Sequence, residues 1–180
     1  MTQIISVATI KTTVGLAGTV EDRKLQPFVD GVQLSVEKML GQTLYGELIT
    51  AIEADATLAT EADLKELRDD YIAPYIAWAV YLQSLSRLYA EFDRNGAHYK
   101  NDGNTVQADA AWLRMEQATA RDNSDKYADR LLDFLKDNSD TGEPFASWRT
   151  VTDTEQGERI NKTYGVGIVT RRSKWQNSQR

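Results

Sequence analysis

The chain has 180 residues, no cysteine and one histidine, and its 27 acidic and 21 basic side chains give a net charge of −6. This length favours one domain with a sizeable core, while the missing cysteines exclude disulfides, thiolate nucleophiles, cysteine zinc sites and iron–sulfur ligation. A single histidine excludes multi-histidine metal sites, and the acidic balance argues against a free nucleic-acid-binding protein, which would usually be basic.

No segment carries the pattern of a membrane or export signal. The N-terminal residues, Met1 to Thr9, contain neither a basic region nor a long apolar run, so we expect no signal peptide. The longest stretch without a charged side chain, Tyr71 to Ser86, includes Pro74 and is shorter than the roughly 20 apolar residues of a membrane-spanning helix. We therefore expect cytosolic synthesis and no membrane partner.

The first firm helix is predicted at residues 26–40. Pro27 suits a first helical position, because its missing N–H would have no partner there. Gly41 is placed to end this helix as the residue after its C-cap. A second, short helix is expected from about 42 to 55, with one apolar face formed by Leu44, Leu48 and Ile52.

The strongest pattern belongs to a predicted helix at about 61–94. Its apolar side chains recur at alternating steps of four and three, which is a heptad seam. The seam comprises Tyr71, Tyr75, Trp78, Leu82, Leu85, Tyr89 and Phe92. Ile72, Ile76 and Val80 make a second apolar face, and a helix with two apolar faces has to be covered on both. We expect this helix to be the central element, its seam to lie in the core or in a subunit interface, and Pro74 to kink it.

A loop and a further long helix are expected next. The Asn95-Gly96 and Asp102-Gly103 pairs predict a loop between antiparallel helices. The helix after it should run from about 105 to 138. The predicted fold is therefore mainly α: a small helical bundle with a long kinked central helix, formed by residues 1–140, and an extended C-terminal tail, formed by residues 141–180.

The tail differs from the body in charge. Residues 1–140 carry 23 acidic and 14 basic side chains, whereas residues 141–180 carry four and seven, and no acid follows Glu158. A basic tail on an acidic body suggests docking onto an acidic partner, and residues 164–170 could form a short strand. The residues expected to dock are Tyr164, Ile168, Val169, Arg171, Arg172, Lys174 and Trp175. A disordered, solubilising tail is the alternative, although its aromatic and β-branched residues argue against it.

Residues with catalytic or metal-binding potential have simpler interpretations. His98 lies in a polar stretch with no local nucleophile or orienting carboxylate, so we interpret it as a solvated histidine. Asp63, Glu66 and Asp70 share one helical face, and such carboxylates can bind metal in bundles. Lys65 and Arg68 are interleaved with them, however, and acids are favoured near a helix N-terminus anyway. A second acidic stripe is interpreted as a charged outer face; it comprises Asp125, Asp129, Asp133 and Asp137.

Two motif-like segments fail on their chemistry. The segment from Asp137 to Gly142 resembles the start of a calcium loop, but its twelfth position is Trp148, where a bidentate glutamate is required. Gly165 and Gly167 form a lone G-x-G without the third glycine and helix of a dinucleotide site. We therefore expect no catalytic residue, no metal and no cofactor, and we expect that the protein is not an enzyme.

Three stretches, in this order, are shared with a known group of proteins. A short N-terminal element spans Ile10 to Leu16. Leu25 to Gln33 then leads into Met39 to Tyr45, in which a helix ends at a Leu-Gly pair followed by a polar step and Leu-Tyr. The third stretch is the proline-bearing run from Tyr71 to Ala77, which leads to Asn95-Gly96. Over about residues 10–140 the chain thus resembles the head–tail connector (adaptor) proteins of tailed bacteriophages.

This resemblance implies a fold, a location and a role. Such proteins are small helical bundles that assemble, usually as twelve copies, into a ring under the portal in the virion neck, after synthesis in the host cytoplasm. The ring extends the DNA channel without sequence readout and contacts the tail or a second ring protein, and extended termini often clasp the portal. An acidic body suits a DNA conduit, because a lumen that repels phosphate lets DNA slide.

Two other interpretations remain open. The first is a soluble helical protein-binding or regulatory module that acts as a monomer or dimer. The second is an enzyme that uses a carboxylate metal cluster at Asp63 and Glu66.

Overall fold

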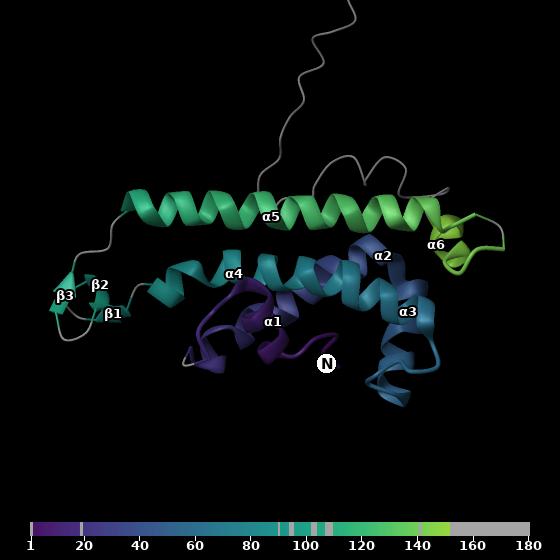
Figure 1. Cartoon of the computed structure of the whole chain (residues 1–180), viewed down its shortest axis with the longest axis horizontal. Coiled ribbons are helices and arrows are strands. Elements are labelled where there is room, and N and C mark those ends of the chain that lie inside the picture. Colours follow the sequence, from purple (N-terminus) through teal and green to yellow (C-terminus); the bar gives the residue numbers. More distant parts are fainter. Residues whose placement is uncertain are drawn as a thin grey trace, which may run out of the picture.

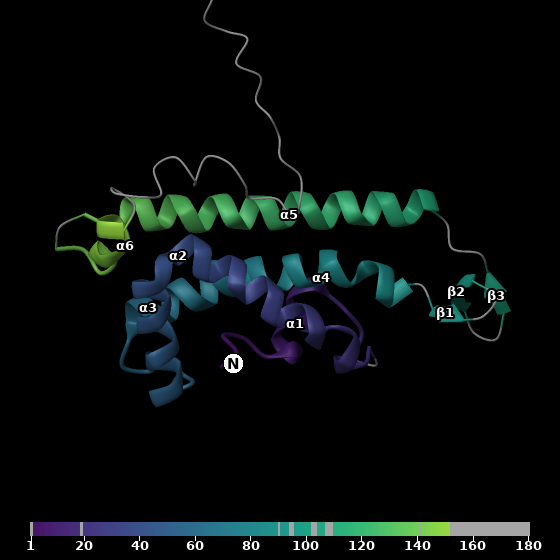
Figure 2. The same ribbon diagram turned by 180° about the vertical axis from the view of Figure 1, so that it is seen from behind.

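The computed structural model describes residues 2–18, 20–89, 91–93, 96–101, 104–106, 110–140 and 142–151. The fold is mainly α-helical, as predicted. Two long helices, α4 (Ala73–Tyr89) and α5 (Ala110–Asp137), lie antiparallel, and the N-terminal half of the chain packs against the side of α4 that α5 leaves open (Figures 1 and 2).

The N-terminal segment is held against the bundle by a buried amide. Gln33 is fully buried; its Oε1 accepts a hydrogen bond from the Ile4 N–H (3.0 Å) and its Nε2 donates one to the Thr2 carbonyl (3.1 Å). After this segment Ser6 caps α1 (Val7–Val14) by accepting from the Thr9 N–H, and Gly15 ends it in the left-handed conformation. A single 3-10 turn, η1 (Asp22–Lys24), leads to the next helix.

Helix α2 (Gln26–Ala54) is two helical rods joined at Gly41. Gly41 has φ 76° and ψ 161°, a backbone conformation that essentially only glycine adopts. The predicted helices at 26–40 and 42–55 are confirmed, with the break at the predicted residue. Pro27 lies in the first turn, as expected, and Leu44, Leu48 and Ile52 are buried on one face of the second rod.

The central helix changes type before its proline. Residues Ala62–Glu66 are α-helical (α3), Leu67–Ile72 form a π-helix (η2), and α4 follows. The Ala73 N–H bonds to the Arg68 carbonyl, five residues back. Because Pro74 has no N–H for the carbonyl of Asp70 and its ring crowds that turn, an ordinary α-helical ladder cannot pass this point. Where a kink was predicted at Pro74, the structure shows a widened, π-helical turn just before it.

The connection after α4 is a small sheet, where a loop was predicted. Strands β1 (Glu91–Asp93), β2 (Gly96–Asn101) and β3 (Asn104–Val106) form an antiparallel meander in which Phe92 pairs with Ala97 and Tyr99 with Val106. Helix α4 accordingly ends at Tyr89 rather than at residue 94, and Phe92, predicted as the last residue of the helical seam, lies on β1 instead. Strand pairing replaces helix continuation here: Asp93 pairs with Gly96, the glycine of the first predicted turn dipeptide, and Asn101 pairs with Asn104.

The packed body extends past the predicted boundary at residue 141. Helix α6 (Ala146–Val151) follows α5, and Phe145 and Trp148 are both buried in the main core. Phe145 packs against Phe134 of α5, with ring centroids 5.7 Å apart. The beginning of the predicted tail is therefore part of the helical body. Burial of two large aromatic side chains is a strong stabilising contribution to the free energy of folding.

Helix α4 is the central element, as predicted. It contacts α5 on one side and both α1 and α2 on the other. Ile72, Ile76 and Val80, the second apolar face of the sequence pattern, are fully buried. Among the described helices, none is both long and apolar enough to cross a membrane.

Candidate subunit interface

Some side chains of the aromatic seam on the central helix are buried in the core, and others are only half-buried at its edge. Tyr75 and Leu85 are buried, whereas Tyr71, Trp78 and Leu82 are half-buried and Tyr89 is the last residue of α4. The seam therefore packs mainly within the chain. Burial raises the pKa of the Tyr75 hydroxyl above its ordinary value, so this side chain is a neutral core residue at physiological pH.

Tyr71 is covered by α5 of the same chain. Its ring stacks on Phe134, with centroids 4.0 Å apart and planes at 18°. The guanidinium of Arg130 lies over the rings of both Tyr71 and Tyr127, at 5.7 and 5.5 Å from their centroids. These contacts place a cation on two aromatic faces in the geometry of a cation–π interaction.

A smaller apolar cluster lies toward the outer end of the hairpin. Tyr81, Leu85 and Ala120 form its buried part, and Trp78 and Leu82 pack against it. The Tyr81 hydroxyl donates to the Glu116 carboxylate (2.8 Å), which fixes the register of α4 against α5. This cluster is separate from the main core and supports the outer part of the hairpin.

The outer end of α5 carries the clearest exposed apolar side chain. Met115, in the second turn of α5, is 61% exposed, and the neighbouring Trp112 and Leu113 are half-buried. This end of the hairpin and the β-meander project beyond α1 and α2 (Figure 1). We call residues 111–116 the arm tip. The sequence pattern did not single out Met115, because it lies off the apolar stripe of its helix.

Three of the four acidic side chains predicted to form an outer face on α5 are exposed, and the fourth, Asp125, is not. Asp129, Asp133 and Asp137 are exposed on α5, and Asp133 pairs with Lys136 (2.9 Å). Asp125 differs: it is half-buried, and desolvation raises the pKa of its carboxyl group.

The other polar candidates are dispersed over the surface and the meander. Asp63, Glu66 and Asp70 are exposed, and the described residues contain no group of three side chains placed to hold a metal ion. His98 lies on β2 of the meander.

The candidate docking residues of the tail lie outside the described residues. They are Tyr164, Ile168, Val169, Arg171, Arg172, Lys174 and Trp175.

Comparison with protein families gives a match over two thirds of the chain. The model of a family of unknown function, DUF6712, matches residues 36–157. The matched region runs from the first rod of α2 past α6 and includes the whole hairpin. Comparisons with curated proteins and with solved structures returned no match.

Proposed function

We propose a structural role in the bacteriophage neck for this chain, which belongs to the DUF6712 family of unknown function. In this proposal the protein forms a ring that joins the portal to the tail or to the next neck component and extends the DNA channel. Its partners are further copies of itself, the portal protein and the next neck protein. It acts without catalysis or cofactor and resides in the virion.

The observation that carries the proposal is the projecting arm with its apolar tip. Helix α5 is about 42 Å long at 1.5 Å per residue, and its first turns extend past the N-terminal helices (Figure 2). Met115 exposes its thioether at this end. A projecting apolar tip that meets a different surface on the next copy makes a heterologous contact, which is the kind that closes rings.

The charge distribution supports the same role. The outer face of α5 is of mixed charge, because it exposes Lys126, Arg130 and Lys136 together with Asp129, Asp133 and Asp137. The acidic balance lies in the body as a whole, where residues 1–140 carry 23 acidic and 14 basic side chains, and an acidic body repels the DNA backbone rather than binding it. The sequence after Glu158 has basic side chains and no acidic ones, which suits docking on an acidic portal surface. Deletion of residues 159–180 should therefore abolish portal docking and leave the helical body folded.

The arm-tip contact is tested with two matched substitutions. Met115→Glu places a charge at the tip, while Leu34→Glu places one on α2, where Leu34 is 49% exposed. Light scattering of the purified chain, alone and mixed with a candidate portal, should show a ring-sized species or saturable portal binding. Met115→Glu should reduce that assembly at least tenfold, and Leu34→Glu should leave it within twofold of the unsubstituted chain.

Two results of these experiments would contradict the proposal. A chain that stays monomeric and ignores the portal would favour the alternative, a helical protein-binding or regulatory module. Equal loss of assembly by both variants would show that the arm tip is not the contact.

A further inference from the structure

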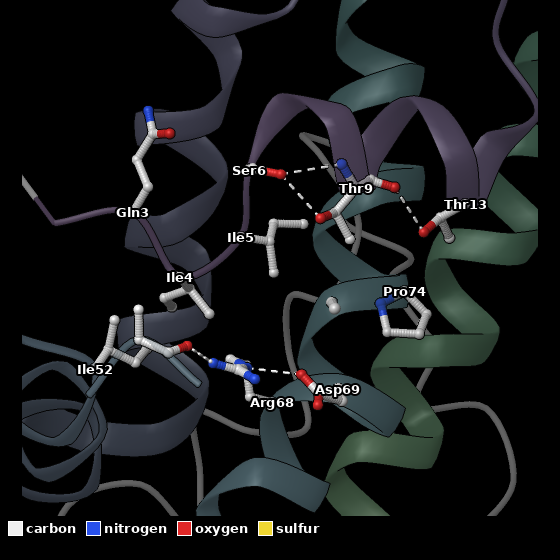
Figure 3. Close-up of a pocket in the computed structure, with 12 residues that line it drawn as sticks. Gln3, Ile4, Ile5, Ser6, Thr9, Thr13, Ile52, Arg68, Asp69 and Pro74 are labelled. Carbon is white, nitrogen blue, oxygen red and sulfur yellow. Dashed lines mark hydrogen bonds and ion pairs between the residues drawn. The ribbon is translucent and has the colours of Figure 1, made fainter. Parts of the chain in front are cut away.

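A pocket of about 560 Å³ lies under the N-terminal segment (Figure 3). One wall is this segment and α1, another is the end of α2 with the turn after it, and the third is the junction of η2 and α4. Ile4, Ile5, Ile52, Ala73 and Pro74 make much of the lining apolar. A volume of this size is in the range of small-molecule sites.

Arg68 brings a buried positive charge to this pocket. The residue is 9% exposed; its Nε donates to the Asp69 carboxylate (2.7 Å) and its Nη1 donates to the Ala56 carbonyl (2.6 Å). A guanidinium has five N–H donors, so three have no partner within the described part of the chain. Arg68 stands in the π-helical segment, and such segments recur at functional sites.

Hydroxyl groups add to the polar side of the pocket. The Ser6 and Thr9 hydroxyls lie 2.9 Å apart and share one hydrogen bond. Whichever of them donates, the hydrogen of the other hydroxyl remains for a ligand oxygen. Thr13, also in the lining, donates its hydroxyl to the Thr9 carbonyl. The pocket therefore offers donors from Arg68 and from the Ser6–Thr9 pair.

The charge balance selects the kind of anion. Asp69 already pairs with Arg68, and the charge of Arg68 also acts on the Asp55 carboxylate. Any anion here therefore meets carboxylates as well as the one cation, and this repulsion is larger for a dianionic phosphate than for a singly charged group. A carboxylate carries one charge, and two parallel N–H groups of a guanidinium match its two oxygens. The apolar wall in turn matches an aliphatic group attached to that carboxylate.

We propose that this pocket binds an aliphatic carboxylate, with the guanidinium of Arg68 on its oxygens and the isoleucine wall on its hydrocarbon part. The ligand is a free small acid or the terminal carboxylate of a partner chain, which share this chemistry. The proposal does not depend on ring formation, because every residue it uses belongs to one copy.

The first test is a titration of the full chain followed by the backbone amide resonances of Thr9 and Arg68. Isobutyrate should shift them saturably, and isobutyramide, the neutral isostere, should not. N-acetyl-glycyl-valine and its C-terminal amide separate the two sources. Tighter binding of the dipeptide acid than of isobutyrate assigns a chain terminus, and the reverse assigns a free acid. Equal effects of acid and amide, or no saturable shift with either acid, would overturn the proposal.

The second test uses a matched pair of substitutions. Ala56 lines the pocket and is exposed, so Ala56→Leu fills space there while Arg68 stays in place. Ala59→Leu makes the same change in the same turn but outside the lining. Ala56→Leu should weaken isobutyrate binding at least tenfold, and Ala59→Leu should leave it within twofold. Arg68→Met should abolish binding, consistent with the loss of hydrogen bonds to a charged group. Equal binding by Ala56→Leu and Ala59→Leu would exclude this pocket.

Discussion

The indole Nε1 of Trp148 donates a hydrogen bond to the backbone carbonyl of Met39, 3.0 Å away and 109 residues earlier in the chain. Met39 lies in the last turn before the break at Gly41. Carbonyls in the last turn of a helix lack partners within that helix, and this one is buried. The α6 segment therefore satisfies a group that the kink in α2 leaves open.

Trp148→Phe should destabilise the fold, because phenylalanine keeps the ring but has no N–H to donate. We expect a loss of about 1–3 kcal/mol in the free energy of unfolding, the cost of a buried acceptor without its donor. Urea unfolding measures this loss. Trp78→Phe makes the same change at a half-buried indole that contacts Tyr81 through its ring edge. That control should cost clearly less, and equal losses would contradict the role given to the Met39 carbonyl.

Shortening the chain should separate the body from the tail. A chain ending at residue 158 keeps Phe145 and Trp148 and should unfold at nearly the same temperature as the full chain. A chain ending at residue 140 loses both side chains and should be several kcal/mol less stable. Phe145→Ala in the full chain should cost about 3–5 kcal/mol on its own. Thermal unfolding followed by circular dichroism is the measurement, and a stable 140-residue chain would place Phe145 and Trp148 outside the core.

Gly41 and Gly46 should respond in opposite directions to the same substitution. Gly41 has a positive φ with an extended ψ, so Gly41→Ala should destabilise by about 1–3 kcal/mol. At Gly46, in the second rod of α2, an added Cβ meets no atom, and Gly46→Ala should stabilise by about 0.5–1 kcal/mol through helix propensity. Urea midpoints of the two variants decide the point. Similar shifts in the two midpoints would show that the kink does not require glycine.

The turn after α2 should contribute less to the free energy of unfolding at acidic pH. The Asp55 carboxylate accepts hydrogen bonds from the Thr57 hydroxyl and from the N–H groups of Thr57 and Ala59, which lower the pKa of Asp55 below its ordinary value. A lower pKa in the folded state means that the carboxylate adds stability above the unfolded pKa of about 4 and loses it as the pH falls through the folded pKa.

Asp55→Asn should therefore lower the free energy of unfolding at neutral pH, and the gap to the unsubstituted chain should close as the pH falls below about 4. Urea unfolding between pH 7 and pH 3 follows this gap. Thr57→Val, which removes only the hydroxyl donor, should reproduce part of the difference. A gap that stays constant with pH would contradict the assigned hydrogen bonds.

The helical elements could be predicted where a short-range sequence signal, such as apolar spacing or a glycine at the helix end, determines the local structure. The apolar spacing of residues 26–40, followed by Gly41, predicts both the first rod of α2 and its break. The two apolar faces around Tyr75 and Ile76 predict a helix covered on both sides. These signals are short-range, so the sequence pattern alone contains them.

The elements that depend on distant partners could not be predicted in this way. Phe145 and Trp148 stand in a segment without helical period, and their burial depends on α5 and on the Met39 carbonyl. The arm tip and the Arg68 pocket are likewise products of packing. Arg68 looks in the sequence like one more charge interleaved with Asp63, Glu66 and Asp70. Arg68 lines a pocket only because the N-terminal segment, which Gln33 holds in place, forms the opposite wall.

The hydrogen bond between Trp148 and Met39 also cannot form until late in the synthesis of the chain. A ribosome adding about 5 to 20 residues per second needs roughly 5 to 20 s to travel the 109 residues between them. In the later part of that interval the α2 kink lies outside the ribosome, while the Trp148 donor for its carbonyl has not yet been synthesised. Until then the Met39 carbonyl of the nascent chain is hydrated by water. The packing of α6 against the core is therefore a late step in the folding of the nascent chain.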